Sequence, residues 1–204
     1  MLKKLRVDKS TGRRAVLAEN QTAHLSGIEC SFARTIREIC QALHSDFPRD
    51  YDEAALRRRA IENHRWKIFP PILRDELARR VANLDLPPGA TVHGDLTGDN
   101  VIISDHGEVG VIDFGDTQVA PRIYEHPPIT LDLFLRDPRM IEEYLQAPPK
   151  ESFLDDLFKS ILIHDFGGDI AAGLCSKALG LPPDEVKSLK TLEQALTEFL
   201  SIHL

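Results

Sequence analysis

The sequence predicts an α+β fold that is mostly helical and contains one small β-hairpin. Apolar residues recur at helical spacing through most of the chain from residue 31 onward. Two short β-branched runs, Val101–Ile103 and Val109–Ile112, flank a turn-rich segment and favour a hairpin. The 204 residues suit one domain, or a large lobe with a small one, and an apolar content of 42% is enough to form a core.

The first thirty residues differ from the rest. Leu5–Val7 and Ala15–Ala18 are apolar and flank the turn-forming run 8–12, a pattern typical of a hairpin. We therefore expect two regions, a small β region over 1–30 and a helical lobe over 31–204.

Helical periodicity and capping residues predict the elements of the helical lobe. Asp137 and Pro138 suit an N-cap and a first helical position. Gly167-Gly168 ends one helix, Asp169 caps the next, and Gly180 ends that one. The expected helices cover 31–45, 52–64, 72–84, about 129–136, 138–146, 151–166, 169–180 and 184–202, with a short strand at 91–92.

The hairpin places polar side chains together at one end. A two-residue turn centred on His106-Gly107 puts Asn100 opposite Asp113. Directly opposed residues have Cβ atoms about 4.5–5.5 Å apart, so their oxygens can share one cation. Magnesium favours a few protein oxygens together with phosphates and water, and this pair fits that preference.

Three side chains in this stretch suit phosphoryl transfer. Asp95 precedes Asn100 by five residues, and Asp113 follows the hairpin. An aspartate can orient a hydroxyl and accept its proton, while an amide and a carboxylate oxygen can hold magnesium. A hairpin that simply carries acidic residues at its ends is the alternative, but it does not explain why all three gather at one end.

These motifs resemble the aminoglycoside phosphotransferase (APH) and choline kinase-like family. The resemblance is specific over 92–116, where the chain reads His93-Gly94-Asp95-Leu96, Asn100 and Ile112-Asp113-Phe114-Gly115-Asp116. It implies a protein-kinase-like fold, mainly the C-terminal lobe, and transfer of the γ-phosphate of ATP to a hydroxyl of a small molecule, with Mg²⁺. Asp95 would be catalytic and Asn100 and Asp113 would bind the metal. The supporting residues would be His93, Phe114 and Gly115.

Outside this stretch the resemblance concerns organisation, over about residues 15–204. Ala42–Ser45 resembles the end of the helix that follows the family's hinge, and Ala120–Tyr124 resembles a turn after its metal-binding segment. The family usually continues with Asp there, whereas this chain has Glu125. The hinge that meets adenine would be Glu19-Asn20-Gln21. An N-terminal hairpin without any ligand is an equal alternative for that region.

The sequence has no glycine-rich phosphate loop. It also has no strand lysine followed by a helix with a partner glutamate, as the kinase scheme requires. The N-terminal lobe is therefore expected to be truncated or minimal. Such a chain would bind MgATP weakly, expose an apolar surface, and form a homo-oligomer or accept a partner chain that supplies the lobe.

The composition of the chain limits the classes of partner and the cellular compartment that we expect. A net charge of −7 disfavours nucleic acid and suits either a cationic substrate or simple solubility. Cys30, Cys40 and Cys175 form no Cys-x-x-Cys pair and fit a reducing cytosol. No apolar run reaches the ~20 residues of a membrane span, and the basic start has no signal-peptide core. We expect a cytoplasmic protein without a membrane partner.

Three functional hypotheses follow. The first is an APH-type phosphotransferase, an enzyme with an alcohol group as acceptor. The second is a degenerate kinase-like module that binds nucleotide and acts through a partner chain. The third is a metal-dependent phosphohydrolase that uses His164-Asp165, a pair that would need further ligands.

Overall fold

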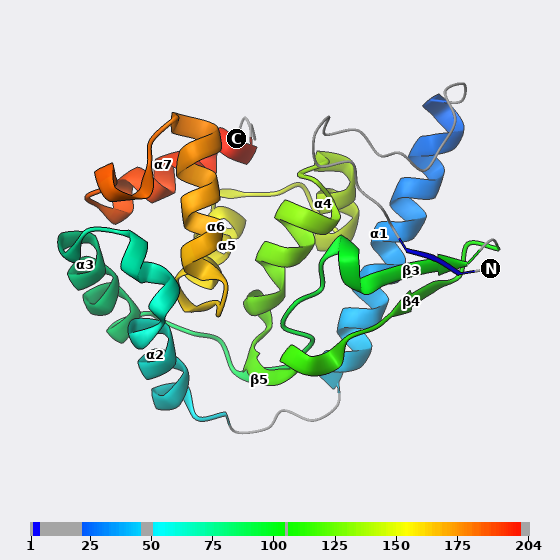
Figure 1. Ribbon diagram of the computed structural model, residues 1–204. Coiled ribbons are helices and arrows are strands. Elements are labelled where there is room, and N and C mark those ends of the chain that lie inside the picture. Colours follow the sequence, from blue (N-terminus) through cyan, green and yellow to red (C-terminus); the bar gives the residue numbers. More distant parts are fainter. Residues whose placement is uncertain (1, 5–21, 46–50, 105, 201–204) are drawn as a thin grey trace. The chain divides into compact units, whose positions relative to one another are not determined.

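The computed structural model describes residues 2–4, 22–45, 51–104 and 106–200, with side chains described from residue 29 onward. Within these ranges the chain is mostly helical with two small sheets, which confirms the predicted α+β class (Figure 1). The α-helices are α1 (Thr22–Ser45), α2 (Glu53–Glu62), α3 (Pro71–Ala82), α4 (Pro138–Leu145), α5 (Glu151–Ile163), α6 (Gly167–Leu174) and α7 (Leu189–Leu200). The strands are β1 (Leu2–Lys4), β2 (Gly89–Val92), β3 (Val101–Ser104), β4 (Val109–Val111) and β5 (Gln118–Pro121).

Short helical turns join these elements. The 3₁₀ turns are η1 (His64–Ile68), η2 (Gly98–Asn100), η3 (Phe114–Asp116), η4 (Arg122–Glu125) and η7 (Pro183–Glu185). Two further turns, η5 (Pro128–Leu133) and η6 (Cys175–Leu179), are π-helical. Across the described ranges, none of the helices is both long and apolar enough to cross a bilayer.

The chain divides into two compact units. One comprises 1–49, 90–119 and 125–149, and the other comprises 50–89, 120–124 and 150–204. The expected boundary after residue 30 falls within α1, which begins at Thr22 rather than at residue 31. The predicted N-terminal hairpin lies outside the described residues, so the assignment of 1–30 to a separate lobe stays a prediction.

The first unit contains an antiparallel sheet in the order β1-β3-β4. The predicted hairpin forms, but its predicted register is wrong by one residue, because Val101 faces Val111. At the turn, the Gly107 N–H donates to the Ser104 carbonyl over 3.0 Å, and Gly107 has a φ of 83°. The loop that ends in left-handed Gly107 has three residues, one more than the two-residue turn that we predicted. The extra residue shifts the register by one.

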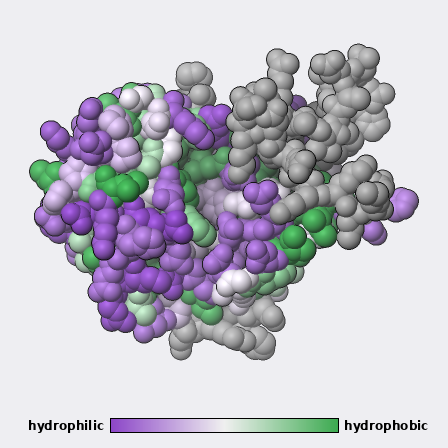
Figure 2. All heavy atoms as spheres, viewed as in Figure 1, coloured by the Kyte–Doolittle hydropathy of each residue, from purple (hydrophilic) through white to green (hydrophobic). Residues whose placement is uncertain are grey.

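The new register changes what lies opposite Asn100. The Ile112 N–H donates to the Asn100 carbonyl over 3.0 Å, so Asn100 faces Ile112 and not Asp113. Figure 2 shows hydrophobic side chains gathered over the hairpin β3–β4. Val101 is fully buried, the other apolar strand residues of the hairpin are only partly buried, and Ile112 is 39% exposed.

Helices α1 and α4 pack together in the first unit. Phe32 of α1 meets the ring of Phe134 edge-on at 6.4 Å, and Phe134 meets Tyr144 of α4 at 5.7 Å. The predicted cap of α4 is confirmed, since the Asp137 carboxylate accepts from the backbone N–H groups of Arg139 and Met140. This packing supports the segment before α4 within the same unit, which carries η5.

The second unit is built around α5 and α6. A Cβ at Gly167 would lie 2.0 Å from the Ile161 carbonyl oxygen, so only glycine fits where α6 begins. Because α6 begins there, Asp169 lies in its first turn, and the prediction that it is the cap is wrong. Gly180, with a φ of 65°, ends η6 as predicted. The last helix begins at Leu189 rather than at residue 184, after the 3₁₀ turn η7.

Candidate active site

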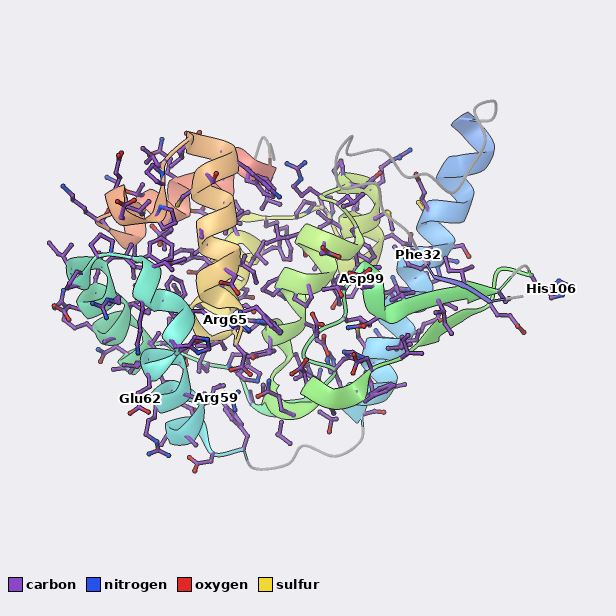
Figure 3. All side chains as sticks on the ribbon, viewed as in Figure 1. Phe32, Arg59, Glu62, Arg65, Asp99 and His106 are labelled. Carbon is purple, nitrogen blue, oxygen red and sulfur yellow. The ribbon has the colours of Figure 1, made fainter. Side chains whose placement is uncertain are left out.

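The candidate active site lies in the first unit, on the loop between β2 and β3. The loop runs from His93 to Asn100 and ends in η2. Figure 3 shows Asp99 at the end of this loop, where β3 begins, and His106 at the opposite tip of the hairpin. Gly94 has a φ of 87°, and a Cβ there would lie 2.3 Å from the Asp116 carbonyl oxygen. The close approach of η3 to the loop therefore requires glycine at this position.

His93 is completely buried and organises the loop through its ring. Its Nδ1 accepts from the Asp95 N–H over 3.3 Å, and its Nε2 lies 3.1 Å from the Ile112 carbonyl oxygen. Because Nδ1 is an acceptor and a carbonyl can only accept, these contacts assign the proton to Nε2. The ring also lies 4.8 Å from that of Phe114. Both nitrogens are thus engaged with the backbone, as expected for a residue that shapes the loop.

Asp95 and Asn100 are joined directly. The Asn100 Nδ2 donates to the Asp95 carbonyl over 2.8 Å and to its Oδ2 over 2.9 Å. With the amide nitrogen committed to Asp95, the amide oxygen of Asn100 faces the other way. Burial first, and then the charge of Asp116, raise the pKa of Asp95, while the Asn100 hydrogen bond opposes them. A half-buried carboxylate of this kind is suited to take a hydrogen bond from a hydroxyl.

Asp113 reaches the same end of the hairpin by a route that we did not predict. It follows Ile112, whose N–H bonds to Asn100 and whose carbonyl lies against the ring of His93. Asp113 itself is exposed and adopts a left-handed conformation with φ 62° and ψ 68°, which opens η3. Non-glycine residues seldom adopt this conformation, and it occurs at functional sites. Phe114, the next residue, is 50% exposed.

The oxygen donors at this site suit magnesium. No group of three or more His, Cys, Asp or Glu that could hold a metal occurs in the described part of the chain. The donors that the sequence spacing predicts are the amide oxygen of Asn100 and the carboxylate of Asp113. This set fits Mg²⁺, which usually takes one or two protein ligands and completes its shell with phosphate oxygens and water.

Glu125 holds the start of the loop, a role that we did not predict. Glu125 is completely buried, and its Oε1 accepts from the His93 N–H over 2.5 Å. Its Oε2 has no hydrogen-bond partner among the described residues. Burial raises the pKa of Glu125 to about 7, and the backbone N–H groups of His93 and Gly94 oppose this rise. The family usually has Asp at the position of Glu125. Because Glu carries the same carboxylate group, this substitution was a signal for this role.

Asp132 is a second carboxylate that sequence analysis missed. It lies on η5, and its Oδ1 accepts from the Gly98 N–H over 3.0 Å. Gly98 lies between Asp95 and Asn100. No pattern in the sequence marks this contact, because it depends on how the π-helical turn meets the loop.

The remaining predicted site residues lie elsewhere. Glu19, Asn20 and Gln21, the predicted hinge, lie outside the described residues. In the second unit, the His164 ring stacks on Tyr124 at 4.2 Å, and Asp165 forms an ion pair with Arg59. These contacts, and the lack of a three-residue metal cluster in the described ranges, give the phosphohydrolase hypothesis no support.

An Asp–Asn loop that is bonded to a hairpin and followed by an aspartate is typical of kinase-like phosphotransferases. Residues 6–150 match the phosphotransferase enzyme family, APH, and the chain belongs to this family. The predicted resemblance is therefore confirmed. No curated protein matches the chain significantly in sequence.

Two solved structures are similar in fold. One is the GDP complex of wild-type aminoglycoside 2'-phosphotransferase-IIIa, with 17% identity and a TM-score of 0.48, and the match covers 85% of this chain and 62% of that one. The other is an ethanolamine kinase from Plasmodium vivax, with 14% identity and a TM-score of 0.37, and the match covers 92% of this chain and 63% of that one. The chain thus spans less than two thirds of the length of either.

Proposed function

We propose that this chain is the catalytic lobe of an ATP-dependent phosphotransferase that acts on a hydroxyl of a small molecule. The observation that carries the proposal is the position of Ile112, which bonds to both Asn100 and His93. It ties the residue before Asp113 to the loop that carries Asp95. Membership of the phosphotransferase family supports the same reaction class.

Each residue has a distinct task in the proposed reaction. Asp95 accepts a hydrogen bond from the acceptor hydroxyl, orients it and takes its proton as the new O–P bond forms and the bond between the γ-phosphorus and the departing ADP oxygen breaks. Asn100 and Asp113 would hold Mg²⁺, which supplies charge neutralisation for the phosphate oxygens of ATP. His93 keeps the backbone of Asp95 and Ile112 in place through its two ring nitrogens.

The exposed Ile112 and Phe114 favour one variant of this proposal. Apolar side chains that are 39% and 50% exposed beside a polar site suit a surface that binds a nucleotide base or a further protein segment. A partner chain or a second copy that completes the lobe is consistent with them. A module that binds nucleotide and works through such a partner is the second candidate function.

The three cysteines are free, which supports the reducing cytosol as the compartment.

Product analysis tests the proposal. The protein is incubated with MgATP and a panel of hydroxyl compounds, namely aminoglycosides, amino-alcohols and sugars, and the products are separated by mass spectrometry. Transfer gives ADP and a phosphorylated acceptor in equal amounts. Release of inorganic phosphate with every compound would contradict transfer. MgATP binding without any product would favour the binding module.

A further inference from the structure

The loop that carries Asp95 is held from outside by two carboxylates of one short segment. Glu125 accepts from the backbone at the start of the loop, and Asp132, seven residues later, accepts from the Gly98 N–H over 3.0 Å. Within the loop itself, the Thr97 N–H donates to the Asp95 carbonyl over 2.9 Å, and the Asn100 amide closes the span. The middle of the loop is therefore connected to the rest of the unit through Asp132.

The turn that carries Asp132 has an unusual backbone. η5 is π-helical, with the Phe134 N–H donating to the Ile129 carbonyl five residues back over 2.8 Å. Two consecutive non-glycine residues with positive φ follow it, Leu135 at 50° and Arg136 at 67°. Left-handed conformations are unfavourable for non-glycine residues, and π-bulges occur frequently at functional sites. A local cost of this kind persists where the surrounding structure requires the geometry.

We propose that Asp132 is a positioning residue for phosphoryl transfer and acts through its hydrogen bond to Gly98. This inference rests on the proposed function for its kinetic part and on the geometry alone for its structural part. Gly98 lies between the residue that receives the hydroxyl and the amide that would bind metal. By fixing the Gly98 N–H, Asp132 holds Asp95 and Asn100 at the separation that their mutual hydrogen bonds require.

Two variants at this position separate the hydrogen bond from the charge. Asp132→Asn keeps an oxygen that can accept from Gly98 and removes the negative charge. Asp132→Ala removes the acceptor. The matched control is Thr130→Val on the same turn, because Thr130 is buried and its hydroxyl has no hydrogen-bond partner among the described residues. Thermal unfolding of all three variants establishes that each is folded at the temperature of measurement.

The first readout is amide hydrogen exchange of the unliganded protein, which requires no assumption about function. Loss of a hydrogen bond to a charged acceptor raises the equilibrium constant for local opening of the backbone by roughly 10-fold or more. We expect exchange in the peptide that spans 96–100 to be about 10-fold faster in Asp132→Ala, close to wild type in Asp132→Asn and unchanged in Thr130→Val. Equal exchange in wild type and Asp132→Ala would overturn the anchoring role.

The second readout is turnover of MgATP in the presence of the acceptor found by product analysis. Where no acceptor is phosphorylated, hydrolysis of MgATP by water is measured instead. We expect kcat to fall by about 10-fold or more in Asp132→Ala and to be rescued in Asp132→Asn. Full turnover in Asp132→Ala, or an equal loss in both variants, would overturn the proposal. If wild type neither binds nor turns over MgATP, the proposed function fails, while the exchange experiment still decides whether Asp132 anchors the loop.

Discussion

Replacement of Glu125 by glutamine should change the pH dependence of stability. Glu125 is fully buried beside the loop, and burial raises the pKa of its carboxyl from an ordinary value of 4.5 to about 7. Between these two values the unfolded chain has released the proton and the folded chain retains it. The folded state therefore binds more protons, and the free energy of unfolding falls as the pH rises.

The size of the effect follows from the two pKa values. One pKa unit corresponds to about 1.4 kcal/mol, so the interval from 4.5 to about 7 corresponds to about 3 kcal/mol. This contribution is fully present below about pH 4.5, is lost progressively up to about pH 7 and is absent above that. Glutamine has no proton to release, yet its oxygen can still accept from the His93 and Gly94 N–H groups. Glu125→Gln should thus match wild type in acid and exceed its stability by up to about 3 kcal/mol above neutrality.

Urea unfolding followed by far-ultraviolet circular dichroism, at several values between about pH 5 and about pH 8, measures this difference. The control is Glu142→Gln, since Glu142 is an exposed glutamate on α4. That variant measures, at each pH, the effect of a glutamate-to-glutamine exchange outside the buried site. A constant difference between Glu125→Gln and wild type would refute the reasoning, because Glu125 would then titrate alike in the folded and unfolded chains.

Three further predictions concern the site itself. Asp95→Asn should keep MgATP binding and lose turnover by about 10²–10⁴-fold, and unchanged turnover would contradict the role of Asp95. Asp113→Ala should abolish magnesium-dependent nucleotide binding measured by calorimetry, and Asn100→Ala should weaken it. The metal assignment is wrong if both bind MgATP as wild type does. Gly94→Ala should destabilise the fold by more than Gly107→Ala, because both have positive φ but only a Cβ at Gly94 meets another atom, the Asp116 carbonyl oxygen at 2.3 Å. Equal unfolding free energies of these two variants would contradict it.

The elements that sequence could predict are those fixed by local chemistry. The Asp137-Pro138 start of α4 and the Gly180 end of η6 each follow from one or two residues at the helix end, and both were predicted. The register of the hairpin was predicted wrongly because it depends on whether Gly107 adopts a left-handed conformation. A run of turn-forming residues does not specify that choice. Asp169 was misplaced for a related reason, since the close contact of Gly167 with Ile161 sets where α6 begins.

The candidate site was predictable as a set of residues and unpredictable as a set of contacts. Asp95, Asn100 and Asp113 were chosen from spacing and residue type, and their catalytic and metal-binding roles remain predictions. The carboxylates that hold the loop, Glu125 and Asp132, come from a segment that has no motif of its own. Their contacts arise only when residues 125–133 fold against the loop, so residue type alone could not identify them.

The register error also shows what the site depends on. We predicted that Asn100 and Asp113 approach each other as a cross-strand pair, which a shift of one residue destroys. In the structure, the backbone of Ile112 ties the residue before Asp113 to the loop, with its N–H on Asn100 and its carbonyl against His93. Asp113 is then directed by its own left-handed conformation rather than by the alternation of a strand. Because backbone groups and a buried histidine set this geometry, the side chain of Ile112 is left exposed and available for a ligand or a partner.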